Sequence, residues 1–95
     1  MSNYDDLLHY ERSAAYNREW AERMRQRRSE ARAKGESTRF YDEEISRAER
    51  QASKDAETAI KMRGWMGAGA PSQADLTSVA EQARREVDEM DRRAQ

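Results

Sequence analysis

Apolar residues recur at alternating four- and three-residue steps through the middle of this chain, without interruption. The positions that follow this spacing are Tyr41, Ile45, Ala48, Ala52, Asp55, Ala59, Met62 and Met66. Such steps place side chains on one side of an α-helix, in a seam suited to a facing helix. Most of the surrounding residues are good helix formers. The segment therefore predicts one long amphipathic helix over about 38–63, begun by Ser37 or Thr38 and ended by Gly64.

Two further segments show related patterns. In the first, the stripe contains Leu7, Tyr10, Ala14, Asn17, Ala21, Met24, Arg28 and Ala31; Ser2 and Asp5 form a capping box before it and Gly35 follows it. In the last, a second capping box, Ser72 with Asp75, comes directly after Pro71. Its stripe contains Leu76, Ala80, Ala83, Val87, Met90 and Ala94, with Val79 beside it. We expect helices over about 3–34 and 73–94.

These segments predict an all-α fold in a single domain, residues 1–95, with a Gly-rich connection over 64–71. Short connections favour antiparallel neighbours, so the first two helices should form a long helical hairpin. The third, shorter helix should return along the second or reach another chain. The expected architecture is a three-helix bundle or an oligomeric, coiled-coil-like bundle.

Large apolar side chains are scarce. The chain has 15 alanines but only eight Leu, Ile, Val and Phe residues, and 39% of its residues are charged, with a net charge of -1. A monomer built from so few large side chains would be marginally stable, because ordering each residue costs roughly 1.5 kcal/mol of conformational entropy. We therefore expect a homo-oligomer or a complex with another protein.

Several classes of function find little support in the sequence. There is no cysteine, and hence no disulfide or thiolate chemistry. No apolar run approaches the ~18 residues of a membrane span and no signal peptide is evident, so we expect a cytoplasmic protein. His9, the only histidine, follows Asp5 and Asp6 on one helix side, but such a pair is at most half of a metal site, and acids also suit a helix start. We expect no catalytic residue, metal or cofactor.

A basic run occupies the second half of the first helix. It contains Arg23, Arg25, Arg27, Arg28, Arg32 and Lys34. Arginine suits phosphate and base-edge recognition. The stretch RMRQRRSEARAK resembles the arginine-rich RNA-binding helices of lambdoid phage antiterminators, which likewise mix arginine with Glu and Ala. That resemblance implies a nucleic-acid-binding accessory or regulatory protein. Against it, Glu19, Glu22 and Glu30 share the helix, and the chain as a whole is slightly acidic.

The stretch MRGWMGAGAPS, residues 62–72, places Trp65 and Met66 among three glycines. Either these side chains dock on the end of the helical bundle, or they form a contact point for a partner. Trp65-Met66-Gly67 is similar to the W-x-G motif of the small helical-hairpin substrates of type VII secretion. The motif here follows two predicted helices rather than standing near the middle of the chain, and no tyrosine occurs beyond Tyr41, so that family is not carried over.

We expect a non-enzymatic helical module for protein–protein interaction, such as a small adaptor or an inhibitor of a larger complex, of the kind that phages and mobile elements also encode. The residues expected to bind the partner are Trp65, Met66, Met62 and Trp20, the last on the solvent side of the first helix. Nucleic-acid binding through the basic run is the alternative.

Overall fold

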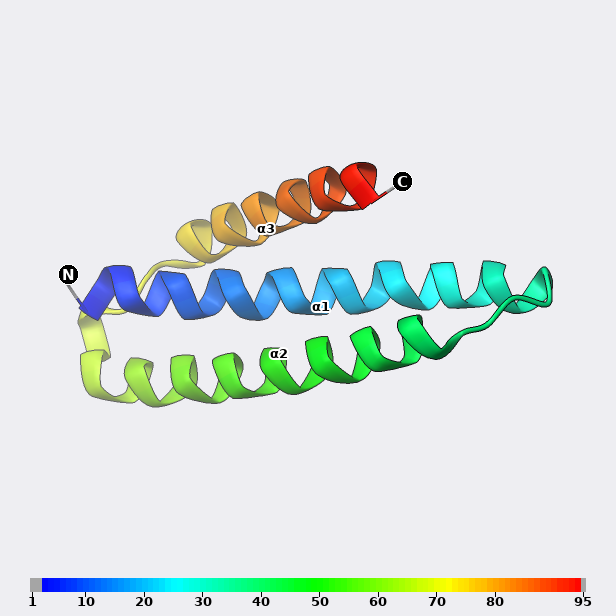
Figure 1. The fold of residues 1–95 in the computed structure, drawn as a ribbon. Coiled ribbons are helices and arrows are strands. Elements are labelled where there is room, and N and C mark those ends of the chain that lie inside the picture. Colours follow the sequence, from blue (N-terminus) through cyan, green and yellow to red (C-terminus); the bar gives the residue numbers. More distant parts are fainter. Residues whose placement is uncertain (1–2, 95) are drawn as a thin grey trace.

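The computed structural model describes residues 3–94, which form three α-helices and one short 3₁₀ turn (Figure 1). Helix α1 spans Asn3–Ala33, α2 spans Arg39–Met66, the turn η1 spans Gly67–Gly69, and α3 spans Gln73–Ala94. The predicted all-α class with three helices is confirmed, and no strand occurs among these residues.

Two of the predicted helix boundaries are held by local hydrogen bonds. After α1, Gly35 has a φ of 72°, its N–H donates to the Arg32 carbonyl, and the Glu36 N–H reaches back to Ala31. This is a Schellman motif, which requires the left-handed conformation that glycine adopts without strain. Before α3, the Asp75 N–H donates to the Ser72 hydroxyl at 3.2 Å and the Ser72 N–H donates to the Asp75 carboxylate. The earlier capping box includes Ser2, which lies outside the described residues.

The expectation that Gly64 ends the second helix is wrong. Helix α2 continues through Gly64 to Met66, and it ends where Gly67 turns to a φ of 55° and donates its N–H to the Arg63 carbonyl. A glycine inside a helix costs about 1 kcal/mol relative to alanine. The extra turn packs Met66 against a cluster formed by Leu7, Ala59 and Met62, which offsets that cost.

Helix α1 lies in the middle of the molecule, with α2 antiparallel on one side of it and α3 parallel to it (Figure 1). The third helix therefore packs against α1, not along α2 as one reading of the sequence expected. The connection after α2 crosses near the beginning of α1, so α3 starts beside α1 (Figure 1). There, the Tyr4 hydroxyl of α1 donates a hydrogen bond to the Asp75 carboxylate of α3. The result is an elongated molecule of 52 × 21 × 20 Å.

The interface between α1 and α2 follows the predicted seam. Its apolar parts are a small cluster at the Leu7 end and a larger one at the other, formed by Trp20, Ala21, Met24, Ile45 and Ala48. Val87 of α3 completes the larger cluster. Between them lie two buried polar residues, Asn17 in the stripe of α1 and Asp55 in the stripe of α2. The Ser13 hydroxyl donates to Asp55 at 2.5 Å, and Gln51 donates to its other oxygen at 3.1 Å. A satisfied polar layer of this kind fixes the register of two facing helices.

The buried stripe of α3 differs from the predicted one. Its buried residues are Val79, Ala83, Val87 and Asp91, whereas Ala80, Met90 and Ala94 are exposed. The predicted heptad spacing placed Met90 in the buried stripe, whereas the buried residues of α3 follow one another at a constant four-residue step. Asp91 can occupy the last buried position because two arginines of α1 neutralise it.

Candidate interaction surfaces

Trp65 is the most exposed large apolar side chain of the described structure, with 77% of its surface accessible. It belongs to the last turn of α2, beside Met66, which is half-buried. Because α2 runs antiparallel to α1, this turn lies opposite the first residues of α1 (Figure 1). The predicted docking of Trp65 on the bundle end is therefore not observed. The indole stands on an ordered helix rather than on a flexible loop.

Two of the predicted partner-binding residues belong to the core instead. Trp20 is 8% exposed and Met62 is 6% exposed. The placement of Trp20 on the solvent side of the first helix is wrong, because this residue lies three positions after Asn17 and four before Met24, both buried on the same side of α1. The Trp20 indole N–H donates to Glu44 of α2 at 3.2 Å, which satisfies its polar atom inside the interface.

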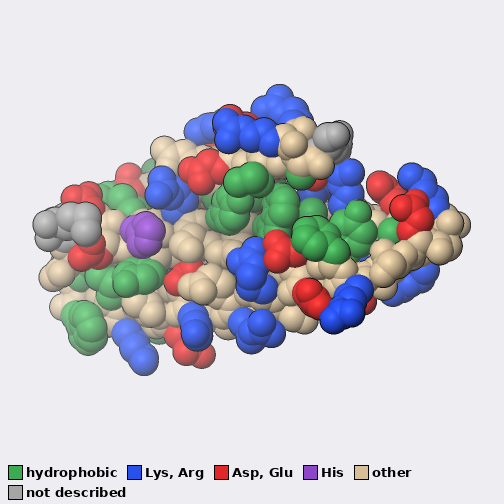
Figure 2. All heavy atoms as spheres, viewed as in Figure 1, with side chains coloured by type: hydrophobic (Ala, Val, Ile, Leu, Met, Phe, Trp, Pro, Cys, Tyr) green, Lys and Arg blue, Asp and Glu red, His purple; other side chains and the backbone are tan. Residues whose placement is uncertain are grey.

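Phe40 and Ile60 add two exposed apolar side chains that the sequence analysis did not single out, with 62% and 66% of their surfaces accessible. Both belong to α2 and fall outside its seam, which is the signal that could have identified them. The Phe40 ring meets the half-buried Tyr41 ring edge to face, with 5.5 Å between centroids. Figure 2 shows apolar side chains gathered over α1, in the space between α2 and α3.

The basic run is largely engaged within the chain. Arg25 pairs with Glu22 of its own helix, at 3.1 Å, and with Glu49 of α2, and Arg28 pairs with Asp42 of α2 at 3.2 Å. Arg23 and Arg27 face α3 instead. Only Arg32 and Lys34, near the end of α1, are fully exposed members of the run. On the face drawn in Figure 2, basic and acidic side chains are interspersed.

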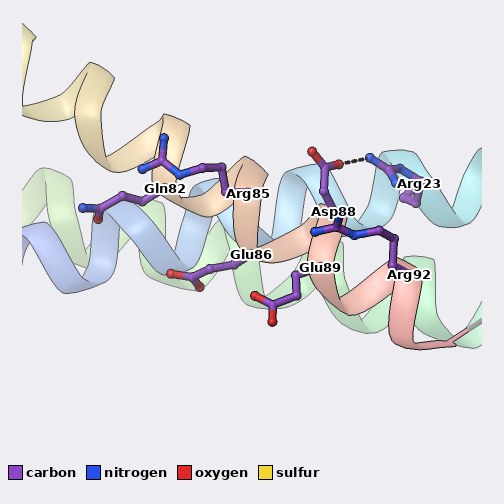
Figure 3. Close-up of a pocket in the computed structure, with 7 residues that line it drawn as sticks. All are labelled: Arg23, Gln82, Arg85, Glu86, Asp88, Glu89 and Arg92. Atoms are coloured by element: carbon purple, nitrogen blue, oxygen red, sulfur yellow. Dashed lines mark hydrogen bonds and ion pairs between the residues drawn. The ribbon is translucent and has the colours of Figure 1, made fainter.

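Asp91 is a buried carboxylate at the centre of a charge cluster between α1 and α3. Its carboxylate accepts hydrogen bonds from Arg23 at 2.8 Å and from Arg27, which contacts both carboxylate oxygens at 2.8 Å. Arg23 also reaches Asp88 (Figure 3). Burial alone would raise the pKa of the Asp91 carboxyl, but the hydrogen bonds from Arg27 and Arg23 outweigh it, so its pKa lies below the ordinary value. Sequence reasoning missed this cluster because an isolated Asp on a helix carries no signal of burial.

A surface hollow of about 700 Å³ lies along α3 (Figure 3). The seven side chains that line it are those of Arg23, Gln82, Arg85, Glu86, Asp88, Glu89 and Arg92. Three of these side chains are basic and three are acidic, so the hollow presents no net charge to a small ion. Its residues include no Ser, His or Lys that could pair as nucleophile and base.

Residues 3–94 contain no group of three or more His, Asp or Glu side chains that could hold a metal ion. His9 is exposed, and its ring contacts Tyr10 edge to face at 5.4 Å between centroids. None of the helices in this range is long and apolar enough to cross a membrane. No known family model, curated protein or solved structure matches this chain.

Proposed function

We propose that this chain is a non-enzymatic protein–protein interaction module, an adaptor or an inhibitor of a larger complex, whose contact surface is centred on Trp65. The observation that carries this proposal is the 77% exposure of that indole at the end of an ordered helix. A chain with so few large apolar residues leaves one of its two tryptophans outside its own core.

The chemistry of the site suits a binding anchor. Tryptophan is enriched among the residues that dominate binding energy, and methionine adapts its shape to a partner. Met66 is half-buried beside Trp65 and packs on the α1–α2 interface, so the anchor rests on the rigid part of the molecule. Because the backbone at Trp65 is already helical, less conformational entropy is lost on binding than for an anchor on a flexible loop.

The ion pairs of the basic run favour this proposal over the nucleic-acid alternative. Four of its six members, namely Arg23, Arg25, Arg27 and Arg28, contact carboxylates of the same chain. Phosphates would have to displace those carboxylates, so the net attraction for a nucleic acid is reduced. Nucleic-acid binding stays an untested prediction: binding to RNA or DNA at about 50 mM salt that weakens steeply as salt is raised would favour it.

The test compares two exposed aromatic residues of α2. Trp65→Ala should leave the free energy of unfolding within about 0.5 kcal/mol of the wild-type value, because the indole is exposed. In affinity capture from the native host, the same variant should lose the specifically retained protein, with a cost in binding of about 2 kcal/mol or more once the partner is purified. Phe40→Ala is the matched control and should retain the partner.

Two outcomes would contradict the proposal. If Trp65→Ala and the wild type capture the same proteins with the same affinity, the indole is no anchor. If Trp65→Ala unfolds the protein, the side chain has a structural role that its exposure does not indicate.

A further inference from the structure

Helix α3 is attached to the rest of the molecule almost entirely through α1. From one end to the other, its side-chain pairs join Tyr4 to Asp75, Arg12 to Glu86, Glu19 to Arg84, Arg23 to Asp88 and Asp91, and Arg27 to Asp91. Among the described residues, the ion pairs that join α3 to another helix all reach α1, and α3 meets α2 where Val87 shares an apolar cluster with Ile45 and Ala48. The surface of α1 that contacts these α3 side chains is called the α3 seat below.

The apolar part of the α3 seat is small. The buried apolar residues of α3 are Val79, Ala83 and Val87, and its fourth buried residue is Asp91. Three basic residues of the seat, Arg12, Arg23 and Arg27, face three acidic residues of α3, Glu86, Asp88 and Asp91. The α3 seat is therefore complementary to an acidic helix with small apolar side chains, and α3 of the same chain is such a helix.

The connection before α3 makes few contacts with the rest of the molecule, so it is suited to act as a hinge. None of the residues from Gly67 to Pro71 is buried, and a side-chain carbon added at Gly67 would meet nothing within 4 Å. The closed turn nevertheless depends on Gly67, because its φ of 55° is strained for any other residue. Fully extended, these five residues would span roughly 17 Å. That length allows α3 to leave its own α1 and reach a neighbouring molecule.

We propose that α3 exchanges between two copies of this chain, so that each α3 occupies the α3 seat of the other copy in a domain-swapped dimer. Every contact between α1 and α3 is reproduced in the dimer, and only the conformation of residues 67–71 differs. The two states then differ little in intrinsic stability, and protein concentration shifts the balance toward the dimer. This inference does not depend on Trp65 or on the proposed function.

Charge reversal on opposite sides of the contact tests the exchange directly. One full-length chain carries Arg23→Glu and Arg27→Glu, and the other carries Asp88→Arg and Asp91→Arg. Within either chain alone, like charges now face each other, so α3 leaves its own seat. In a 1:1 mixture, swapping restores opposite charges at both seats. Sedimentation equilibrium should therefore show a heterodimer of twice the 11.1 kDa chain mass.

A second pair of chains controls for attraction between oppositely charged molecules. Arg50→Glu with Arg92→Glu in one chain, and Glu57→Arg with Glu81→Arg in the other, change the net charge equally but involve exposed side chains outside the paired residues of the seat. This control mixture should associate no more than the wild type does. The proposal is overturned if the seat variants stay at the mass of one chain when mixed, or if the control pair associates as strongly.

The hinge gives an independent measurement. Gly67→Ala penalises the closed turn in both copies, so the dimer association constant should rise about tenfold or more. Gly64→Ala is the matched control, because Gly64 is helical and has no neighbour within 4 Å of an added carbon. It should leave the association constant unchanged. If Gly67→Ala also leaves that constant at the wild-type value, the hinge does not open and the proposal is wrong.

Discussion

The two sides of α1 hold their partner helices in different ways. Between α1 and α2, small residues on both helices, such as Ala21 of α1 and Ala48 of α2, let the helices approach closely, and Trp20 and Met24 of α1 fill the wider space. Toward α3, α1 presents arginines that pair with carboxylates beside an apolar contact that includes the buried Val87. Both interfaces combine buried apolar side chains with ion pairs, but the first buries more apolar side chains and the second holds more ion pairs.

This difference predicts two levels of stability within one small molecule. Burial of apolar surface changes little with salt or mild acid, whereas ion pairs weaken with both. The hairpin of α1 and α2 should therefore be the stable unit, and α3 the part that opens first. Local opening of this kind is common for elements with few buried apolar contacts.

The largest effect should come from Trp20→Ala. Removing a buried tryptophan from a core costs about 3–5 kcal/mol, and here it also leaves Glu44 without the indole donor. Since small domains have only about 5–15 kcal/mol of stability, we expect a large drop in melting temperature, or loss of the fold, by circular dichroism. A near-wild-type melting curve would contradict the central role of this interface.

A smaller and more local effect is expected for Asp91→Asn. The substitution keeps the shape of the side chain but removes the charge that accepts hydrogen bonds from Arg23 and Arg27, so α3 docking should weaken by about 2 kcal/mol. Hydrogen exchange should accelerate over residues 73–94 while the α1–α2 hairpin keeps its protection.

The control for that measurement is Glu89→Gln. Glu89 pairs with Arg93 within α3, at 2.6 Å, and both side chains are exposed. Such a pair contributes only about 0.3–0.5 kcal/mol. Equal acceleration in both variants would show that the cross-helix cluster has no special role.

Acid should weaken the α3 side before the hairpin. The pKa of Asp75 is lowered by the hydrogen bond from Tyr4 and by those from Ser72, and that of Asp91 is lowered as described above. A carboxyl with a lowered folded pKa contributes stability above its unfolded pKa of about 4 and loses it as pH falls further. Hydrogen exchange of α3 should accelerate below that pH. If hydrogen exchange accelerates in the hairpin before it does in α3, the prediction that the docking of α3 depends more on charge than the hairpin does is wrong.

Glu44 is a carboxyl of this kind in the hairpin. A hydrogen bond from Arg47 lowers the pKa of Glu44, against the effect of burial, and the Trp20 indole adds to the lowering. Because the apolar clusters of this interface do not titrate, we expect acid to reduce its stability by less than it reduces the docking of α3.

The helices and several of the residues that begin or end them could be predicted from the sequence. The Schellman glycine at Gly35, the capping box of Ser72 with Asp75, and the seam of α2 are local features, set by residues a few positions apart. Even the buried polar positions Asn17 and Asp55 followed from the seam, because the side of a helix on which a residue lies depends only on its spacing.

The roles of the two tryptophans and of the arginines were decided only by the tertiary structure. Spacing tells which residues share a side of one helix, but not which neighbouring helix will cover that side or where the neighbour ends. Trp20 is buried because α1 is covered along its middle, and Trp65 is exposed because α2 reaches the end of α1. Arg23 and Arg27 became structural residues once α3 placed Asp88 and Asp91 beside them, from more than 60 positions away in the chain.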